Sequence, residues 1–263
     1  MRAIFAICLI LLSTNAPAQG LFSMESTEGA RRWEAVGRLE IAGEAFCTGA
    51  LISPSLVLTA AHCLFDPATG ARVPIDDIQF LAGWRNGRAA AYRRTRKAMP
   101  HPEYDFTSSD SVARVGHDIA LIELQHPIRN TTVLPFGTSD LPGPGAEVGV
   151  VSYAHNRSEA PSMQDLCTVI AHQFDMLVLS CSVDFGASGS PVFAFDTNGE
   201  ARIVSVISAK AEADGKAVSL AVDLLKPLKE LRAALAVAQD PGNGLEPMAA
   251  GARRETGAKF VKP

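Results

Sequence analysis

The 263-residue sequence predicts an all-β protein, built as a barrel or a sandwich. Between about residues 33 and 222, short apolar or alternating runs recur, and turn residues separate them. The chain contains 21 glycines and 16 prolines, which suit many turns rather than long helices. Because 47% of the residues are hydrophobic and only 20% are charged, the chain can bury a core, and global disorder is excluded.

The sequence predicts a series of strands followed by a single helix. A Gly- and Pro-rich stretch at 135–144 is expected to join two halves of similar size. The helix is predicted over 223–238, with Asp223 as its N-cap and Pro227 near its first turn, where a missing N–H costs little. The strands are predicted over residues 35–41, 46–52, 56–59, 78–83, 90–98, 119–124, 146–153, 166–171, 176–181, 191–195, 203–208 and 217–222.

The two ends of the chain differ from this pattern. Arg2 precedes an apolar run over 3–12, and Ala16-Pro17-Ala18 has the small-x-small pattern of a cleavage site, so residues 1–18 are predicted to be a secretory signal peptide. The run would span about 15 Å as a helix, too short for a membrane core of about 30 Å. We therefore expect a secreted or periplasmic protein without membrane contact after cleavage.

Two further segments flank the predicted domain. Residues 19–32 are expected to be an N-terminal segment or a short propeptide, and 239–263, which lack periodicity, a disordered tail. Removal of the signal peptide also removes Cys8 and leaves an even number of cysteines. These four cysteines permit three pairings, and they lack the C-x₂-C spacing of a zinc site.

The charge balance bears on possible partners. There are 24 Lys and Arg residues against 28 Asp and Glu residues, a net charge of −4, which argues against a nucleic-acid surface. We interpret the basic run at 93–97 as the solvated face of a strand rather than a polyanion site. Asp66, Asp76 and Asp77 are interpreted as solvated acids rather than a calcium loop. We expect a monomer with no metal and no cofactor.

Three short motifs carry the chemistry. The run LTAAHC ends a strand-like segment at His62, HDIAL places Asp118 before an apolar strand, and GASGSP places Ser188 between glycines. Amide hydrolysis needs an activated nucleophile, because a free hydroxyl is too weak. An imidazole can take the hydroxyl proton while a buried carboxylate orients it. Glycines let backbone N–H groups point at the oxygen on which negative charge develops.

Together these motifs resemble those of the trypsin-like (chymotrypsin-fold) serine proteases, especially the bacterial glutamyl-endopeptidase-like branch. The match runs through TAAHC (59–63), HDIAL (117–121) and GASGSP (186–191), and the resemblance covers about residues 33–238. It implies one protease domain over 33–238, made of two six-stranded antiparallel β-barrels with a C-terminal helix and an active site between the barrels.

The resemblance also implies roles for individual residues. His62 would be the general base, Asp118 the carboxylate that orients it, and Ser188 the nucleophile, with the N–H groups of Gly186 and Ser188 as the oxyanion hole. Asp105 and Asp110 are weaker alternatives for the acid. Ser190 is a weaker alternative for the nucleophile, because Pro191 follows it and offers no N–H donor.

The remaining implications concern cysteines and specificity. The family commonly bridges the position of Cys47 and Cys63, which leaves Cys167 and Cys181 as the second disulfide. Ser182, six residues before the nucleophile, would lie at the base of the substrate pocket, and Ser208 would belong to its wall. Ser182 is not acidic, which disfavours a preference for Arg or Lys, and no histidine lies near Ile207 to favour glutamate. We predict no preference for a particular substrate side chain.

One departure concerns activation. Ala187 stands where the family's GDSGGP motif has an acidic residue, which pairs with a new N-terminal ammonium in vertebrate-type members. Alanine cannot form this ion pair. We expect either activity once the signal peptide is removed or a role of 19–32 as a short propeptide.

The sequence therefore predicts a serine endopeptidase that cleaves protein or peptide substrates through an acyl-enzyme. The alternative is a catalytically weak homologue that acts as a binding module. A chaperone-protease with added peptide-binding domains is disfavoured, because too few residues follow Ser188.

Overall fold

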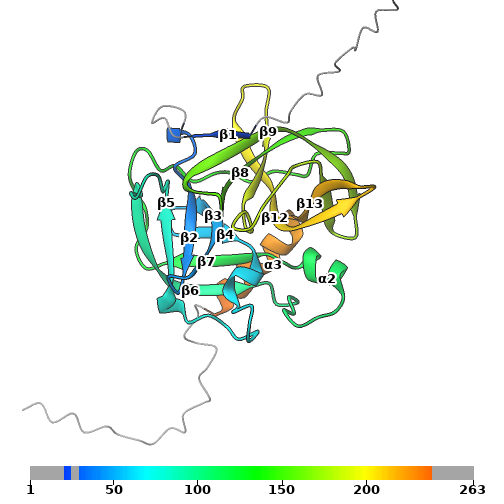
Figure 1. Cartoon of the computed structure of the whole chain (residues 1–263). Helices are drawn as coiled ribbons and strands as arrows, with labels where there is room; N and C mark the ends of the chain where they lie inside the picture. The colour runs from blue at the N-terminus through cyan, green and yellow to red at the C-terminus, as the bar shows by residue number, and fades with distance from the viewer. Residues whose placement is uncertain (1–20, 25–29, 239–263) are drawn as a thin grey trace, which may run out of the picture.

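The computed structural model describes residues 21–24 and 30–238 (Figure 1). The predicted signal peptide at 1–18 and the predicted tail at 239–263 lie outside these residues. Two antiparallel barrels of six strands lie side by side, as the resemblance implied, and one longer helix follows the last strand. In the described part of the chain, every helix is too short or too polar to cross a lipid bilayer.

The first barrel closes in the strand order β2-β3-β4-β7-β6-β5. Leu39, Leu51, Phe80 and Ile122 fill it, because alternate residues of each strand point inward. All six predicted strands in this half are present with small shifts at their ends. They are β2 (Val36–Ile41), β3 (Ala45–Ser53), β4 (Leu56–Thr59), β5 (Ile78–Ala82), β6 (Ala91–Pro100) and β7 (Ala120–Leu124).

The second barrel runs in the order β9-β10-β13-β12-β11-β8 and closes because β8 also pairs with β9. A short strand, β1 (Leu21–Ser23), adds to β9 as a seventh member of the sheet, and its three residues are too few to show the apolar alternation that predicts a strand. The six barrel strands are β8 (Glu147–Ala154), β9 (Arg157–Gln173), β10 (Met176–Leu179), β11 (Pro191–Phe195), β12 (Ala201–Ala213) and β13 (Lys216–Asp223).

Two strands of this barrel are much longer than predicted. The predicted strands 166–171 and 203–208 are the apolar parts of β9 and β12, which have 17 and 13 residues. The end of β12 is largely exposed, and its apolar residues are alanines that alternate with Lys210 and Glu212. Because alanine does not favour strands, this segment lacks the signal of β-branched or aromatic residues that identifies one. It is nevertheless paired as far as Ala213 with Lys216, across a turn at Asp214 and Gly215 whose φ values are 51° and 72°. Such an Asp-Gly pair is typical of a tight hairpin turn.

The helices also correct the prediction. Helix α3 (Leu225–Val237) has Leu224 at its N-cap position, so Asp223 is not the cap that was predicted. Asp223 ends β13 and pairs with His172 at 3.3 Å. Pro227 lies in the first turn, as predicted. A second helix, α2 (Ser111–Gly116), was not predicted because six residues are too few to show a helical period.

A shared core joins the barrels. Leu58 and Leu121 from the first barrel belong to the same buried cluster as Tyr153 and Phe193 from the second. Helix α3 buries Leu228, Leu231 and Leu235 in this cluster, which follows from their helical spacing. The connecting stretch 135–144 passes between the barrels, with hydrogen bonds to both Leu51 and Ile203. This packing fixes how the two halves face each other.

Candidate active site

A cavity of about 600 Å³ is lined by residues of both barrels, including His62, Asp118 and Ser188. His62 lies in a short 3₁₀ helix, η1 (Ala61–Leu64), directly after β4. Asp118 lies between α2 and β7, and Ser188 in the loop between β10 and β11. Each of the three is therefore held at the end of a barrel strand, where rigid elements position a side chain accurately.

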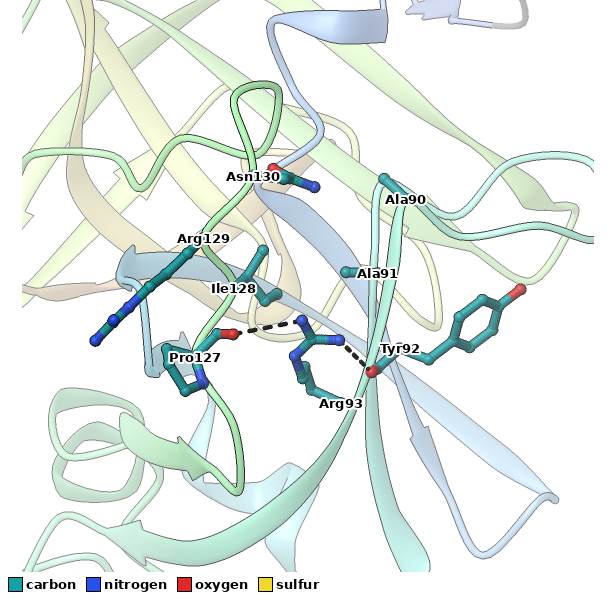
Figure 2. A pocket seen from close by; sticks show the side chains of 8 residues that line it. All are labelled: Ala90, Ala91, Tyr92, Arg93, Pro127, Ile128, Arg129 and Asn130. Carbon is teal, nitrogen blue, oxygen red and sulfur yellow. Dashed lines mark hydrogen bonds between the residues drawn. The ribbon is translucent and has the colours of Figure 1, made fainter.

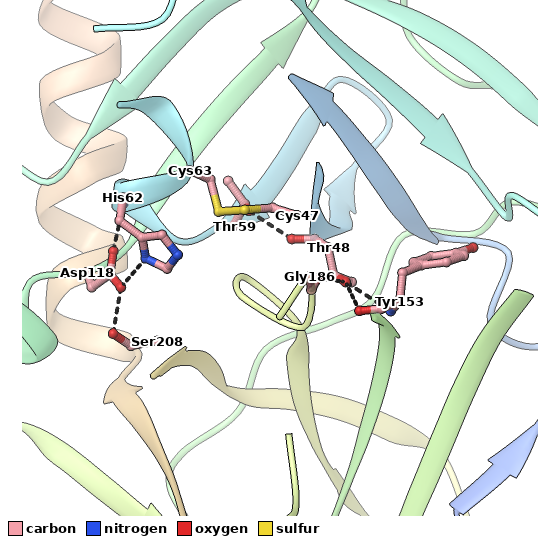
Figure 3. Close-up of a disulfide and its surroundings, with 9 residues drawn as sticks. All are labelled: Cys47, Thr48, Thr59, His62, Cys63, Asp118, Tyr153, Gly186 and Ser208. Carbon is pink, nitrogen blue, oxygen red and sulfur yellow. Dashed lines mark hydrogen bonds and ion pairs between the residues drawn. A yellow bond between two sulfur atoms is a disulfide. The ribbon is translucent and has the colours of Figure 1, made fainter. Parts of the chain in front are cut away.

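His62 and Asp118 are joined by two hydrogen bonds (Figure 3). The imidazole Nδ1 lies 2.7 Å from Asp118 Oδ2, and the backbone N–H of His62 donates to Asp118 Oδ1 at 2.8 Å. The Asp118 side chain is only 4% exposed. A carboxylate bonded to Nδ1 fixes the tautomer of the ring and leaves Nε2 free to exchange a proton.

Ser208 completes the surroundings of this carboxylate. Its hydroxyl donates to Asp118 Oδ2 at 2.5 Å, and the residue is buried while its surface still lines the cavity. The family resemblance implies only a place in the substrate wall for Ser208. The contact with Asp118 was missed because no local pattern relates a strand residue of one barrel to a loop residue of the other.

The charge of Asp118 controls the protonation of His62. Burial by itself lowers the pKa of His62, and Arg114 lowers it further. The charge and the hydrogen bond of Asp118 outweigh both effects, so the pKa of His62 is raised above its ordinary value. The imidazolium is therefore stabilised in place, as a proton acceptor next to a nucleophile requires.

The loop that carries Ser188 is pinned to the first barrel. Thr48 of β3 donates through its N–H to Ser188 O at 2.8 Å and through its hydroxyl to Gly186 O at 2.9 Å. Gly186 has a φ of +93°, and a Cβ there would lie 2.4 Å from the Phe46 ring. Both the backbone conformation and the lack of space therefore require glycine at this position.

Two backbone donors in this loop are available for a ligand. Among the described residues, the N–H groups of Gly186 and Ser188 donate to no other group, whereas the intervening Ala187 N–H donates to Asp184 O. The Ser188 hydroxyl has no hydrogen bond to His62 in this structure, although both line the cavity. Hydrogen bonds of this kind often tighten only when substrate binds.

The alternative residues lie elsewhere. Asp105 is exposed and accepts hydrogen bonds from Thr107, and Asp110 caps α2 through the N–H groups of Val112 and Ala113. Ser190 is completely buried. None of the three lines the cavity.

The structure does not bring Ser182 into the cavity. Ser182 is exposed, and its N–H donates to Gln164 Oε1. The neighbouring Val183, Asp184 and Phe185 line the cavity instead, opposite residues 207–210 of β12. Lys210 Nζ lies 3.4 Å from Asp184 Oδ1 and 4.1 Å from the centre of the Phe185 ring. This cation near the cavity was not identified from the sequence.

Two disulfides support the site. Cys47–Cys63 joins β3 to the helix that carries His62, and Cys167–Cys181 joins β9 to the segment before Ser188. Both pairings are those that the resemblance implied. Cys47 and Cys63 lie near His62 in a group that could otherwise hold a metal ion. Because the two cysteines are bonded to each other, they offer no thiolate ligand.

A second cavity, of about 550 Å³, lies between the start of β6 and residues 127–130 (Figure 2). The Arg93 guanidinium there donates to the backbone carbonyls of Tyr92, His126 and Pro127. All three nitrogens of the guanidinium are thus bonded within the protein. This cavity shares no lining residue with the first and has none of the residues of the three motifs.

Comparisons with known proteins agree with this arrangement. The family model described as Trypsin matches residues 23–226. Glutamyl endopeptidase of Bacillus licheniformis is 29% identical over 151 residues, which cover 56% of this chain and 45% of that protein. Serine protease 56 of Mus musculus is 31% identical over 117 residues, 44% of this chain and 18% of that protein. The chain thus spans less than half the length of these curated relatives.

A solved structure gives the same picture of the fold. The structure of a Glu endopeptidase in complex with MPD superposes with a TM-score of 0.67, covering 84% of this chain and 98% of that one, at 18% sequence identity. At this identity the likeness concerns the fold. The family match, the two barrels and the three motifs lead to one assignment: the chain belongs to the trypsin family of chymotrypsin-fold serine proteases, and a glutamyl endopeptidase is among the proteins that it resembles.

Proposed function

We propose that the protein is a serine endopeptidase that hydrolyses peptide bonds of protein or peptide substrates through an acyl-enzyme on Ser188. One observation carries the proposal: a buried carboxylate, Asp118, holds His62 by two hydrogen bonds in the cavity that Ser188 also lines. Membership of the trypsin family and the names of the relatives, which include an endopeptidase and a serine protease, support it.

The first half of the reaction forms the acyl-enzyme. Nε2 of His62 takes the proton of the Ser188 hydroxyl as its oxygen attacks the carbonyl carbon of the substrate. The negative charge that develops on the carbonyl oxygen is stabilised by the N–H groups of Gly186 and Ser188, at about 3 kcal/mol per donor. The imidazolium, stabilised by Asp118, then protonates the leaving amine, and the peptide bond breaks.

The second half returns the enzyme to its starting state. His62 removes a proton from a water molecule, which attacks the ester carbon of the acyl-enzyme. Collapse of the second tetrahedral intermediate expels the Ser188 oxygen, which recovers its proton from His62. The carboxylic acid product leaves. Ser208 takes no direct part and acts as a positioning residue through Asp118.

The location follows from the cysteines and the predicted leader. Disulfides persist in oxidising compartments, and this chain has two that tie down segments next to the site. We therefore place the protease outside the cytoplasm, secreted or periplasmic. Ala187 is completely buried and has no charge, so activity does not depend on an ion pair between position 187 and a new N-terminus.

A binding module without activity is the second candidate, because the Ser188 hydroxyl is not hydrogen-bonded to His62 in this structure. A fluorophosphonate probe separates the two candidates, since it reacts only with an activated serine. The protease is expected to be labelled, Ser188→Ala to lose the label, and the neighbouring Ser190→Ala to keep it if it folds. A correctly folded protein that takes up no label would support the binding module.

A further inference from the structure

A cluster of histidines and carboxylates lies next to the proposed active site but takes no part in the reaction. His101 directly follows β6, Glu103 lies in the turn after it, and His117 is the C-cap residue of α2. Glu230 reaches the cluster from α3. Four side chains from separate parts of the chain are therefore brought together beside Asp118.

Within the cluster, each histidine contacts one glutamate. His101 Nε2 lies 2.9 Å from Glu230 Oε2, and His117 Nε2 lies 3.0 Å from Glu103 Oε2. The two imidazole rings stack with their centres 5.0 Å apart and their planes 8° from parallel. One ring nitrogen of each histidine and one oxygen of Glu103 lie within 4.8 Å of one another.

We propose that His101, Glu103 and His117 form a binding site for a divalent transition-metal ion, with Zn²⁺ as the representative ligand. Two imidazoles and a carboxylate are a common set of zinc ligands, and water can complete the coordination. Because a metal–nitrogen bond lies in the plane of the imidazole, the His117 ring must turn out of its stack on His101 to share one ion with it. The ligand atoms already lie within 4.8 Å of one another, and the side chains of Glu103 and His117 are 69% and 25% exposed, which leaves them room to turn. The ion would replace the pairing of His117 Nε2 with Glu103 and the hydrogen bond that the Glu103 N–H donates to His101 Nδ1, while His101 Nε2 keeps its contact with Glu230.

Charge and burial favour such an ion. The two neighbouring carboxylates, Glu103 and Glu230, carry two negative charges, which one divalent cation neutralises. His101 is 2% exposed, so its ring is already held in place and loses little freedom on binding. Its Nε2 is paired with Glu230, so Nδ1 is the ring nitrogen on the side of Glu103, whose N–H lies 3.3 Å from it. Glu230 then acts as the outer partner that orients His101.

The site would tie a wall of the substrate cavity to the rest of the first barrel. The segment between His101 and His117 contributes Tyr104, Phe106 and Arg114 to the lining. Its two ends are already joined through Ile119, the residue before β7, because His101 N–H donates to Ile119 O and Ile119 N–H to His117 O. A bound ion adds a cross-link between the side chains at these ends, so we expect it to stabilise this wall.

Calorimetric titration with zinc chloride tests the proposal on the full chain in the Ser188→Ala background, which prevents self-cleavage. The protein is purified without a polyhistidine tag and stripped with a chelator. One ion is expected to bind per chain and to raise the melting temperature. His117→Ala and Glu103→Gln are expected to weaken binding by about 10-fold or more, since even outer partners of metal ligands contribute 10–100-fold.

Two controls separate this site from others. His126→Ala removes an exposed histidine outside the cluster and should leave binding unchanged. His62→Ala should also leave it unchanged, so loss of binding there would assign the ion to the proposed active site and overturn the proposal. Absence of saturable binding, or equal binding by His117→Ala, would mean that the cluster is only two hydrogen-bonded pairs. Because binding is read directly, the test is independent of proteolysis.

Discussion

Ser208 and Asp118 are 90 positions apart in the sequence, and a hydrogen bond of 2.5 Å joins them. Ser208 belongs to β12 of the second barrel, and Asp118 precedes β7 of the first. The carboxylate that orients His62 is therefore held from the opposite barrel. Any change in how the barrels pack would alter the position of this carboxylate.

Ser208→Ala should lower kcat/KM about 10-fold, because a hydrogen bond to a charged group contributes about 1.5–3 kcal/mol and only part of it acts on the transition state. Kinetics on a peptide substrate, or the rate of fluorophosphonate labelling, measures the effect. Ser205→Ala is a matched control, since Ser205 is equally buried in β12 but bonds to the carbonyl of Val222. An equal loss in both variants would point to general destabilisation instead.

The pH dependence of activity should reflect the raised pKa of His62. The reaction needs a neutral imidazole, so the acidic limb of kcat/KM is expected to have its midpoint above the ordinary histidine value of about 6.5. Asp118→Asn removes the charge that raises this pKa. It should move the limb to lower pH and reduce turnover by about four orders of magnitude. Nearly normal turnover in Asp118→Asn would contradict the role of Asp118.

The ion pair of His62 with Asp118 should also make folding stability depend on pH, but it stabilises the fold at low pH, where activity is lost. Because the pKa of His62 is higher in the folded than in the unfolded protein, the pair stabilises the fold fully below about pH 6.5. This contribution is lost as the pH rises through the raised pKa. Chemical unfolding of Ser188→Ala at a series of pH values should detect it as a difference from the double variant Ser188→Ala, His62→Gln. If the free energies of unfolding of the two proteins changed with pH in the same way, His62 would not contribute the expected pH-dependent stability.

Gly186→Ala should reduce both stability and activity. Its φ of +93° costs a residue with a side chain about 1–2 kcal/mol, and the new Cβ would also clash with the Phe46 ring. Relief of the clash moves the Gly186 N–H, so kcat is expected to fall about 100-fold or more. Gly87→Ala, with φ +79° and no neighbour within 4 Å, has the backbone cost alone and should keep full activity.

Met24→Ala tests whether residues 19–32 remain with the protease. Met24 is buried in the core shared by the barrels, and its N–H donates to Pro161 O beside the pairing of β1 with β9. Truncation should cost about 2 kcal/mol or more of unfolding free energy. Met248→Ala, in the predicted tail, should cost nothing. An unchanged melting temperature in Met24→Ala, with a mature chain beginning after Arg32, would identify 19–32 as a removed propeptide.

Much of the fold could be predicted because barrel strands alternate buried and exposed residues. This local signal identified all six strands of the first barrel, and the separate pattern over residues 223–238 identified helix α3. Apolar alternation does not identify a strand segment that is exposed on both faces. The exposed end of β12 is paired through its backbone across a tight turn at Asp214 and Gly215, and its apolar residues are alanines, which do not favour strands. Helix α2 is similarly defined by one cap, Asp110, rather than by a period.

The chemistry proposed for the candidate site could be predicted from local motifs, because His62, Asp118 and Ser188 each lie in a short run whose neighbours serve the same purpose. The glycines beside Ser188 are an example, since the loop conformation requires them locally. What surrounds these residues could not be predicted in this way. The hydrogen bond from Ser208, the exclusion of Ser182 from the cavity and the meeting of His101 with His117 depend on how distant segments pack. Side chains from different strands meet through the closure and docking of the barrels, and no local pattern records such contacts.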